Sequence, residues 1–211
     1  DNGWLKMLSQ NNKIQLIPEK LTKIEGSRLY GEDGSIYDAD VIVLATGFNV
    51  AEMLNTFEVI GRGGLSVRDA WRDDEPRAYL GTTVRDFPNL FTLYGPNLQP
   101  GHGGSMFTTL EMQVRYAVDL ISQMAEKGLG EIECKCDVES DYNKHLDQSM
   151  EKMVWAHPKV ETYAKNASGR CVAFIPYLNV DFYDMTKAAN LGDFDAFDNK
   201  ILDEVLENQL T

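Results

Sequence analysis

One segment of the sequence combines residue types that could bind an anionic or electron-rich group. Residues 90–94 have the composition of a strand, Gly95-Pro-Asn97 follows, and Gly101-His-Gly-Gly-Ser105 leads into a long amphipathic stretch. The first backbone N–H groups of a helix lack partners within the helix, and the helix dipole adds positive charge there. Because glycines keep side chains out of the approach, this loop predicts a turn that receives an anion or a cofactor. A glycine-rich loop that only turns the chain into a helix would have the same pattern.

Other chemistries find less support. The loop carries no Lys after its glycines, so it is not a P-loop, and no G-x-G-x-x-G motif occurs in the chain. His102 could polarise a substrate or contact a cofactor, although a His among glycines also commonly packs a turn. His145 and His157 lack the spacing and the accompanying carboxylate of a metal site. The absence of G-x-S-x-G argues against a serine hydrolase.

The elements that must position this loop are of α/β character. Short strands are predicted at residues 14–17, 20–25 and 27–30, followed by a tight turn at Asp33-Gly34. The continuous run Val41-Ile-Val-Leu44 is typical of a strand buried on both faces. It ends in Ala45-Thr-Gly47, where small residues allow another chain or a cofactor to approach the backbone.

A long helix is predicted after the loop. Ser105 is its expected N-cap, and Gly128 and Gly130 end it. Its apolar residues recur at three- and four-residue spacing: Phe107, Leu110, Val114, Ala117, Ile121 and Met124. Further along, the pattern predicts a strand over residues 131–138 and helices over 141–154 and 194–206. The strands are too few for a complete doubly wound sheet.

Composition limits the possible partners. The 211 residues carry a net charge of −13, which argues against nucleic acid and against an anionic membrane surface. No apolar stretch approaches the roughly 20 residues of a membrane span, and the start is polar, unlike a signal peptide. The three cysteines are an odd number and fit a reduced, cytoplasmic protein. The chain begins at Asp1 without a Met, which we take to indicate a processed product, a fragment or a partial chain.

The order of several motifs resembles one enzyme family. These motifs are Asp40–Phe48, Trp71, Ala78–Gly81, Phe87–Phe91, Tyr94–Asn97 and Gly101–Ser105. The opening Asp1–Trp4, the segment Met153–Pro158 and the Asn166-x-x-Gly169-Arg170 loop add to the resemblance. Together they resemble the class B flavin monooxygenases of the Baeyer–Villiger subgroup, in particular the 4-hydroxyacetophenone monooxygenase-like branch. Each motif alone is weak, but the ordered set spans nearly the whole chain.

The resemblance implies a fold. The chain would be the C-terminal portion of a flavoprotein with two dinucleotide-binding, Rossmann-like domains, and it would be incomplete on its own. Residues 1–47 would supply the terminal strands of the NADPH-binding domain and the hinge. Residues 48–138 would form the C-terminal part of the FAD-binding domain, and residues 139–211 a helical and loop extension with a substrate-side lid.

The resemblance also implies which residues meet FAD and NADPH. Backbone donors at the helix start would stabilise the pyrimidine edge of the isoalloxazine ring, which is anionic when reduced. The expected cofactor-binding residues are Pro96, Asn97, Gly104, Ser105 and Met106, with Thr46 and Gly47 at the hinge. The expected residues of the substrate side and lid are His102 and Tyr163.

Two positions depart from the family pattern. Ala164 stands where a second aromatic residue usually follows the position of Tyr163, and Tyr177 replaces the Trp of a later Pro-Trp pair. The family's two G-x-G-x-x-G motifs, its fingerprint and its active-site arginine would all lie upstream of Asp1. We therefore expect the chain to need an N-terminal FAD- and NADPH-binding half, whether a separate chain, a cleaved partner or a preceding stretch. By itself it should neither bind FAD tightly nor oxidise NADPH.

The implied activity is insertion of one oxygen atom from O2 next to the carbonyl of a small ketone. An N- or S-oxygenating flavin monooxygenase is the alternative within the same class, because it shares the Ala45-Thr-Gly47 hinge. A degenerate remnant that serves as a non-catalytic binding subunit is the alternative outside it. The intact glycine-rich loop argues against a remnant, which has no need of a cofactor-shaped turn.

Overall fold

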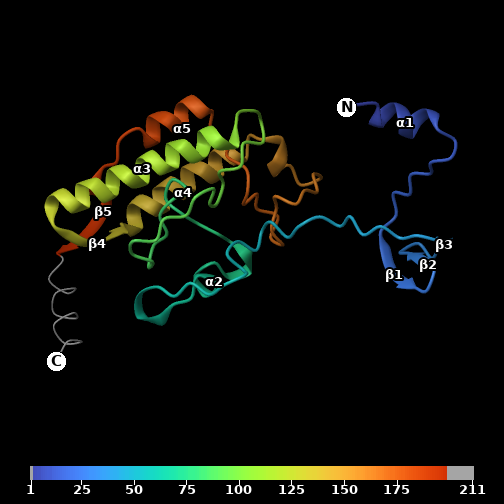
Figure 1. Cartoon of the computed structure of the whole chain (residues 1–211), viewed down its shortest axis with the longest axis horizontal. Helices are drawn as coiled ribbons and strands as arrows, with labels where there is room; N and C mark the ends of the chain where they lie inside the picture. The colour runs from blue at the N-terminus through green and yellow to red at the C-terminus, as the bar shows by residue number, and fades with distance from the viewer. Residues whose placement is uncertain (1, 199–211) are drawn as a thin grey trace. The chain divides into compact units, whose positions relative to one another are not determined.

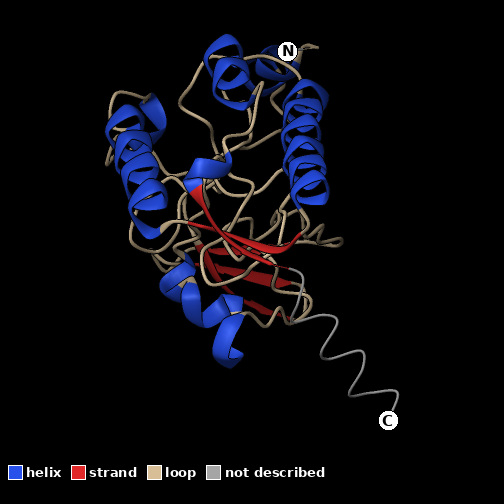
Figure 2. Ribbon diagram, turned by 90° about the vertical axis from the view of Figure 1, so that its left-hand side faces the viewer, coloured by secondary structure: helices blue, strands red, loops and turns tan. Residues whose placement is uncertain are grey.

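The computed structural model describes residues 2–198, and the chain divides after Gly47 into two compact units, each described here by itself. Figure 1 labels the elements in chain order, and Figure 2 shows how much of the chain is loop rather than helix or strand. Among residues 2–198, no helix combines the length and the apolar composition that a membrane span requires.

The first unit is a small antiparallel sheet preceded by a short helix. Its elements are α1 (Trp4–Gln10), β1 (Leu21–Glu25), β2 (Arg28–Gly31) and β3 (Ile36–Asp38). The strands lie in the order β1-β2-β3 (Figure 1). The turn between β2 and β3 places Gly34 at a φ of 87°, and the Asp33 carboxylate accepts the N–H of Ser35 at 2.9 Å. The predicted strands over 20–25 and 27–30 and the turn are confirmed, whereas residues 14–17 form no strand.

The predicted buried strand over Val41–Leu44 is wrong for this chain. These residues pair with no strand among the described residues, and the side chains of Val41, Val43 and Leu44 are exposed. A strand of this composition needs neighbouring strands and a covering layer on both faces. Within the first unit, β1, β2 and β3 pair among themselves, and residues 41–44 join none of them.

The second unit combines helices with one pair of strands. The helices are α2 (Val67–Ala70), α3 (Met106–Lys127), α4 (Cys136–Met150) and α5 (Asn179–Thr186). The strands β4 (Leu129–Cys134) and β5 (Phe194–Asp198) pair antiparallel, and α3 contacts both β4 and α5 (Figure 1). Short 3-10 turns lie at Arg62–Gly64, Arg72–Asp74, Val154–Ala156 and Leu191–Asp193.

Two hydrophobic clusters pack the helices and strands of this unit together. The larger joins α3, α4, β4 and β5 through Tyr116, Leu120, Leu146, Ile132 and Phe194. The second surrounds α2 and is formed by Val67, Trp71, Ala78, Val84 and Phe87. The loop that precedes α3 packs on two further clusters, one formed by Leu98, Ile175 and Phe182 and the other containing Phe174.

Helix α3 begins and ends as predicted. The Ser105 hydroxyl accepts the N–H of Phe107 at 3.2 Å, and Gly128 ends the helix with a φ of 68°. The buried face differs from the prediction, because Thr109, Gln113 and Leu120 face the core whereas Phe107, Val114 and Ile121 are exposed. Both faces carry apolar residues, so periodicity alone could not decide which one packs inside this unit.

Two other predicted elements are corrected. The predicted strand over 131–138 stops at Cys134, because the acidic residues Asp137 and Glu139 favour a helix start, and α4 begins at Cys136 and ends at Met150. Residues 194–198 form strand β5 rather than the start of a helix, because they pair with β4. The remainder of that predicted helix, residues 199–206, lies outside the described residues.

The predicted strand over residues 90–94 forms only an isolated bridge between Phe91 and Thr83. Asn89 and Tyr94 both adopt a positive φ, at 59° and 54°. Left-handed residues at each end turn the chain away from an extended ladder. The segment is held by individual hydrogen bonds instead.

Candidate cofactor-facing site

The start of α3 presents backbone donors without protein acceptors. Within residues 2–198, no acceptor receives the N–H of Gly104, Ser105 or Met106. The carbonyl of Ser105 accepts the N–H of Thr109 at 3.2 Å, so the first helical turn is formed. Gly103 and Gly104 are exposed, and Gly104 has a φ of 102°. This arrangement can receive an anionic or electron-rich group.

The glycine-rich loop packs against the segment 171–179. Nε2 of His102 lies 2.9 Å from the carbonyl oxygen of Tyr177, so this nitrogen carries the proton and donates it. A side chain at Gly101 would come within about 3 Å of the rings of Phe174 and Trp155. Only glycine allows the loop to approach this aromatic pair so closely.

Residues 97–99 run alongside residues 172–175. The N–H of Asn97 donates to the carbonyl of Val172, and that of Gln99 to the carbonyl of Ala173, both at 2.9 Å. The N–H of Ile175 donates back to the carbonyl of Gln99 at 3.0 Å. Hydrogen bonds therefore join the end of the Gly95-Pro-Asn97 motif and the residues just after it to a segment more than seventy residues further along the chain.

The side chain of Asn97 points inward. It is 1% exposed, and its Nδ2 donates to the carbonyls of Cys171 at 2.8 Å and Phe174 at 3.2 Å. Its Oδ1 accepts Nη2 of Arg170 at 3.2 Å. The amide group is thus fully engaged within the protein.

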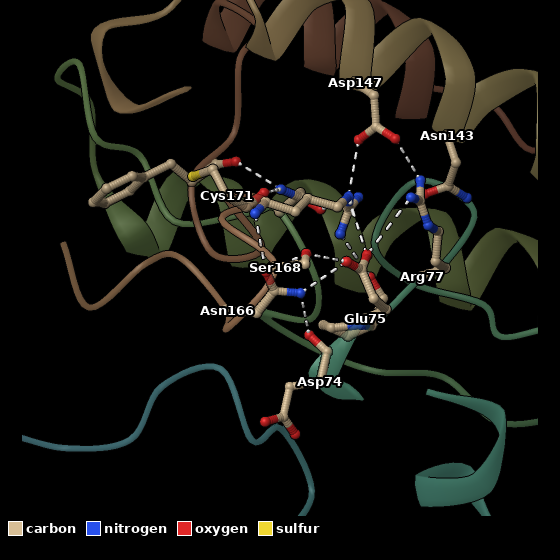
Figure 3. Close-up of polar contacts among 12 residues, drawn as sticks. Asp74, Glu75, Arg77, Asn143, Asp147, Asn166, Ser168 and Cys171 are labelled. Carbon is tan, nitrogen blue, oxygen red and sulfur yellow. Dashed lines mark hydrogen bonds and ion pairs between the residues drawn. The ribbon is translucent and has the colours of Figure 1, made fainter. Parts of the chain in front are cut away.

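Arg170 donates several hydrogen bonds within a partly buried polar cluster, in which Figure 3 labels Glu75, Arg77 and Asp147. Its Nε donates to Asp147 of α4 at 3.0 Å, and its Nη1 donates to the carbonyl of Pro76 at 3.2 Å. Arg77 donates to the other oxygen of Asp147 at 2.7 Å. Burial lowers the pKa of Arg170, and the nearby charge of Arg77 adds to this, whereas Asp147 opposes it.

Glu75 joins the same cluster to the Asn166 loop (Figure 3). Its Oε1 accepts the hydroxyl of Ser168 at 2.6 Å and Nδ2 of Asn166 at 2.9 Å. Desolvation raises the pKa of Glu75, but these two hydrogen bonds and the charges of Arg170 and Arg77 outweigh it. The pKa therefore lies below its ordinary value of 4.5.

This depressed pKa predicts a pH dependence of stability. The contribution of Glu75 is complete above its unfolded-state pKa near 4.5 and is lost as the pH falls through the lower folded-state pKa. We expect Glu75→Gln to lower the free energy of unfolding by about 1 kcal/mol at pH 7. The difference from wild type should shrink toward pH 3, as measured by urea unfolding. Glu161→Gln, at an exposed position of the loop that precedes Asn166, is the control; an equal effect there would contradict the prediction.

Gln113 was not identified from the sequence as a site residue. Its Nε2 contacts the carbonyls of Gly81 and Thr92 at 3.1 Å, and its Oε1 accepts the N–H of Tyr94 at 2.7 Å. The side chain is fully buried. No sequence signal singles it out, because the apolar periodicity of this helix does not decide which face is buried. Gln113 holds the turn that precedes the glycine-rich loop to α3.

Comparison with known proteins identifies the family. No family model matches the chain. A protein of Sinorhizobium fredii named as an uncharacterized monooxygenase (y4iD) is 40% identical over 194 residues, which is 92% of this chain and 29% of that protein. A Baeyer–Villiger monooxygenase of Pseudomonas aeruginosa is 31% identical over 187 residues, 88% of this chain and 35% of that protein. The chain is a homologue of part of the Baeyer–Villiger-type flavin monooxygenases.

Solved structures agree on the fold of this monooxygenase segment. A closed cyclohexanone monooxygenase matches with a TM-score of 0.76 at 21% identity, and a steroid monooxygenase bound to NADP with 0.73 at 22%. The matches cover 94% and 93% of this chain and 38% of each solved chain. The predicted α/β fold, as a portion of a larger flavoprotein, is therefore confirmed. The segment spans about a third of the length of the relatives that it matches.

The remaining predicted site residues of the monooxygenase segment lie in different settings. Tyr163 is 54% exposed, its hydroxyl accepts Nε2 of Gln99 at 2.8 Å, and its ring lies edge-on to Phe174 at 5.9 Å. Tyr163 is therefore joined to the region of the glycine-rich loop. Pro96 is buried, whereas Met106 is exposed at the helix start. Thr46 and Gly47 are exposed at the end of the first unit, and their cofactor contacts stay a prediction.

Proposed function

We propose that the chain is the C-terminal portion of an FAD- and NADPH-dependent Baeyer–Villiger monooxygenase. The complete enzyme would insert one oxygen atom of O2 next to a ketone carbonyl, giving an ester or lactone, while NADPH reduces the other atom to water. The observation that carries this proposal is homology over most of the chain to a named Baeyer–Villiger monooxygenase. The aligned part does not contain a G-x-G-x-x-G motif, so the enzyme needs further residues for both nucleotides.

The residues at the start of α3 fit a flavin. Three adjacent N–H groups, from Gly104, Ser105 and Met106, have no acceptor in the described residues, and glycines keep the approach open. They would hold the electron-rich edge of the ring system, where positive dipole charge is favourable. Bound flavin would supply the redox chemistry, while the chain orients it. Tyr163 and Phe174 would exclude water on the substrate side.

An exposed apolar stripe on α3 supports the proposal that another part of the enzyme packs against this helix. Phe107, Val114, Val118 and Ile121 lie on one helical face and are between 42% and 71% exposed. This face is opposite to the one that packs on β4 and α4. We propose that the N-terminal FAD- and NADPH-binding part covers it, because the curated relatives are about three times as long as this chain.

Val118→Glu tests this contact. A charge within the covered face should weaken association with the nucleotide-binding part at least about tenfold, because burying an unpaired carboxylate is costly. Val118→Leu keeps the face apolar and should associate like the wild type. The measurement is titration of the 211-residue chain with the part of the Sinorhizobium fredii protein outside the matched segment. Equal affinity of the Glu and Leu variants would contradict the proposed contact.

Product analysis tests the reaction type. The matched segment of the Sinorhizobium fredii protein is replaced by this chain, and the chimera is supplied with FAD, NADPH and either an aryl ketone or an amine. We expect an ester from the ketone, with the unmodified Sinorhizobium fredii protein assayed beside it as the folding reference. Oxygenation of the amine alone would favour an N-oxygenating enzyme. A folded chimera that consumes no NADPH, beside an active parent, would favour a non-catalytic subunit.

A further inference from the structure

We infer that Arg170 and Asn97 act as a pair of positioning residues that hold residues 171–175 against the loop leading into α3. This inference rests on the proposed function, which names what the loop and the Tyr163 segment would enclose. It gives the Asn97 side chain an internal role in place of the cofactor contact that the family resemblance implies.

The protein uses the hydrogen-bonding groups of the Asn97 side chain internally. A side-chain amide has two N–H donors and one oxygen acceptor. Both donors are used by the carbonyls of Cys171 and Phe174, and Arg170 occupies the oxygen. With 1% of the residue exposed, the amide has neither a free donor nor access to a bound cofactor. A cofactor contact by this side chain would leave two buried carbonyls without a donor.

Arg170 is itself fixed by hydrogen bonds to three parts of the chain. Its planar guanidinium reaches Asp147 of α4, the carbonyl of Pro76 and Asn97 at 3.0–3.2 Å. The Arg170 side chain is 12% exposed, and Asp147 is held in turn by Arg77. A lysine has a single ammonium group and cannot present three donors in this fork. Helix α4 thus sets the position of the Asn97 amide through Arg170.

The Asn97 amide is connected to Tyr163 on the lid side through Phe174. Asn97 donates to the carbonyl of Phe174 and so fixes the backbone of that residue. Trp155 and Tyr163 pack on the Phe174 ring, at centroid distances of 4.8 and 5.9 Å. The same ring faces Gly101 in the glycine-rich loop. Arg170 and Asn97 therefore determine how the aromatic cluster of Trp155, Tyr163 and Phe174 is placed beside the loop.

The variants Asn97→Asp and Arg170→Lys test this inference. Asn97→Asp keeps the shape and an acceptor for Arg170, but it places an oxygen against two carbonyl oxygens. Hydrogen–deuterium exchange on the full 211-residue chain reports the backbone amides of Val172 and Ile175, which donate to Ala164 and Gln99. We expect their exchange to accelerate about tenfold to a hundredfold in each variant, with α3 unchanged. Arg62→Gln breaks the ion pairs of Arg62 with Glu131 and Glu133 elsewhere in the unit and is the matched control.

A second readout separates positioning from cofactor contact. In the chimera with the Sinorhizobium fredii protein, we expect each variant to raise the KM for the ketone while the absorbance bands of bound FAD stay in place. Unchanged exchange of residues 171–175 would overturn the inference, and so would shifted flavin bands, which would indicate a cofactor contact. If Asn97→Asp unfolds the chain, Arg170→Lys, which keeps the charge, decides by the same criteria. A chimera with wild-type residues that binds no FAD defeats the proposed function, whereas the exchange comparison still decides the positioning role.

Discussion

Replacement of Gln113 by leucine is expected to lower the free energy of unfolding by about 3 kcal/mol, because it leaves several buried polar groups without partners. Gln113 contacts the carbonyls of Gly81 and Thr92, the hydroxyl of Thr82 and the N–H of Tyr94. The residue is 0% exposed, so water cannot replace these bonds without opening the core. Leucine fills nearly the same volume, which limits the cavity and isolates the polar loss. Urea unfolding of the 211-residue chain gives the difference.

Gln123→Leu provides the matched control on the same helix. Gln123 is half-buried, and its Nε2 contacts Asp119 at 3.3 Å and the carbonyl of Ala189 at 3.0 Å. Because Gln123 makes fewer hydrogen bonds at a more exposed position, Gln123→Leu should lower the free energy of unfolding by about 1 kcal/mol or less. Equal losses at Gln113 and Gln123 would show that the turn before the glycine-rich loop does not depend on Gln113.

Gly95→Ala is expected to destabilise the second unit by about 3 kcal/mol, because a side chain at this position has no space. A Cβ atom on Gly95 would overlap the carbonyl oxygen of Gly81 and would lie 2.5 Å from the hydroxyl oxygen of Thr92. The backbone of Gly81 cannot yield easily, since its own carbonyl accepts Thr92 and Gln113. We therefore expect the Tyr94–Asn97 turn to shift and the lid-side segment to loosen with it.

Gly103→Ala separates lack of space from backbone conformation. Gly103 has a φ of 113°, but nothing lies within 4 Å of a Cβ atom there. The substitution should cost about 1 kcal/mol, from the unfavourable conformation alone. Thermal unfolding of both variants measures the difference, and a loss at Gly103 as large as that at Gly95 would contradict the steric argument.

Helix α3 could be predicted from the sequence because the signals for it are local. Ser105 caps its first turn and Gly128 ends it in a left-handed conformation, as the residue types indicate. The predicted strand over Val41–Leu44 is wrong for the opposite reason. A strand of this composition needs a neighbouring strand on each side. None of the described strands pairs with these residues, so composition predicted a context that the described part of the chain does not show.

The candidate site was only partly predictable for a similar reason. The glycine-rich loop and the N-cap Ser105 are contiguous and could be recognised directly. The partner of Asn97 could not, because Arg170 is 73 residues away and the hydrogen bond forms only through tertiary packing. Gln113 was overlooked because helical periodicity counts apolar residues, whereas its function in the fold depends on four polar contacts.

The proposed function is tested most directly by the visible absorbance spectrum of the 211-residue chain with FAD. The spectrum is recorded with the chain alone and after addition of the part of the Sinorhizobium fredii protein outside the matched segment. We expect no bound flavin with either component alone, and a bound-flavin spectrum with NADPH oxidation in the mixture. Tight flavin binding and NADPH oxidation by the isolated chain, or no bound flavin in a mixture whose components associate, would contradict the proposed function.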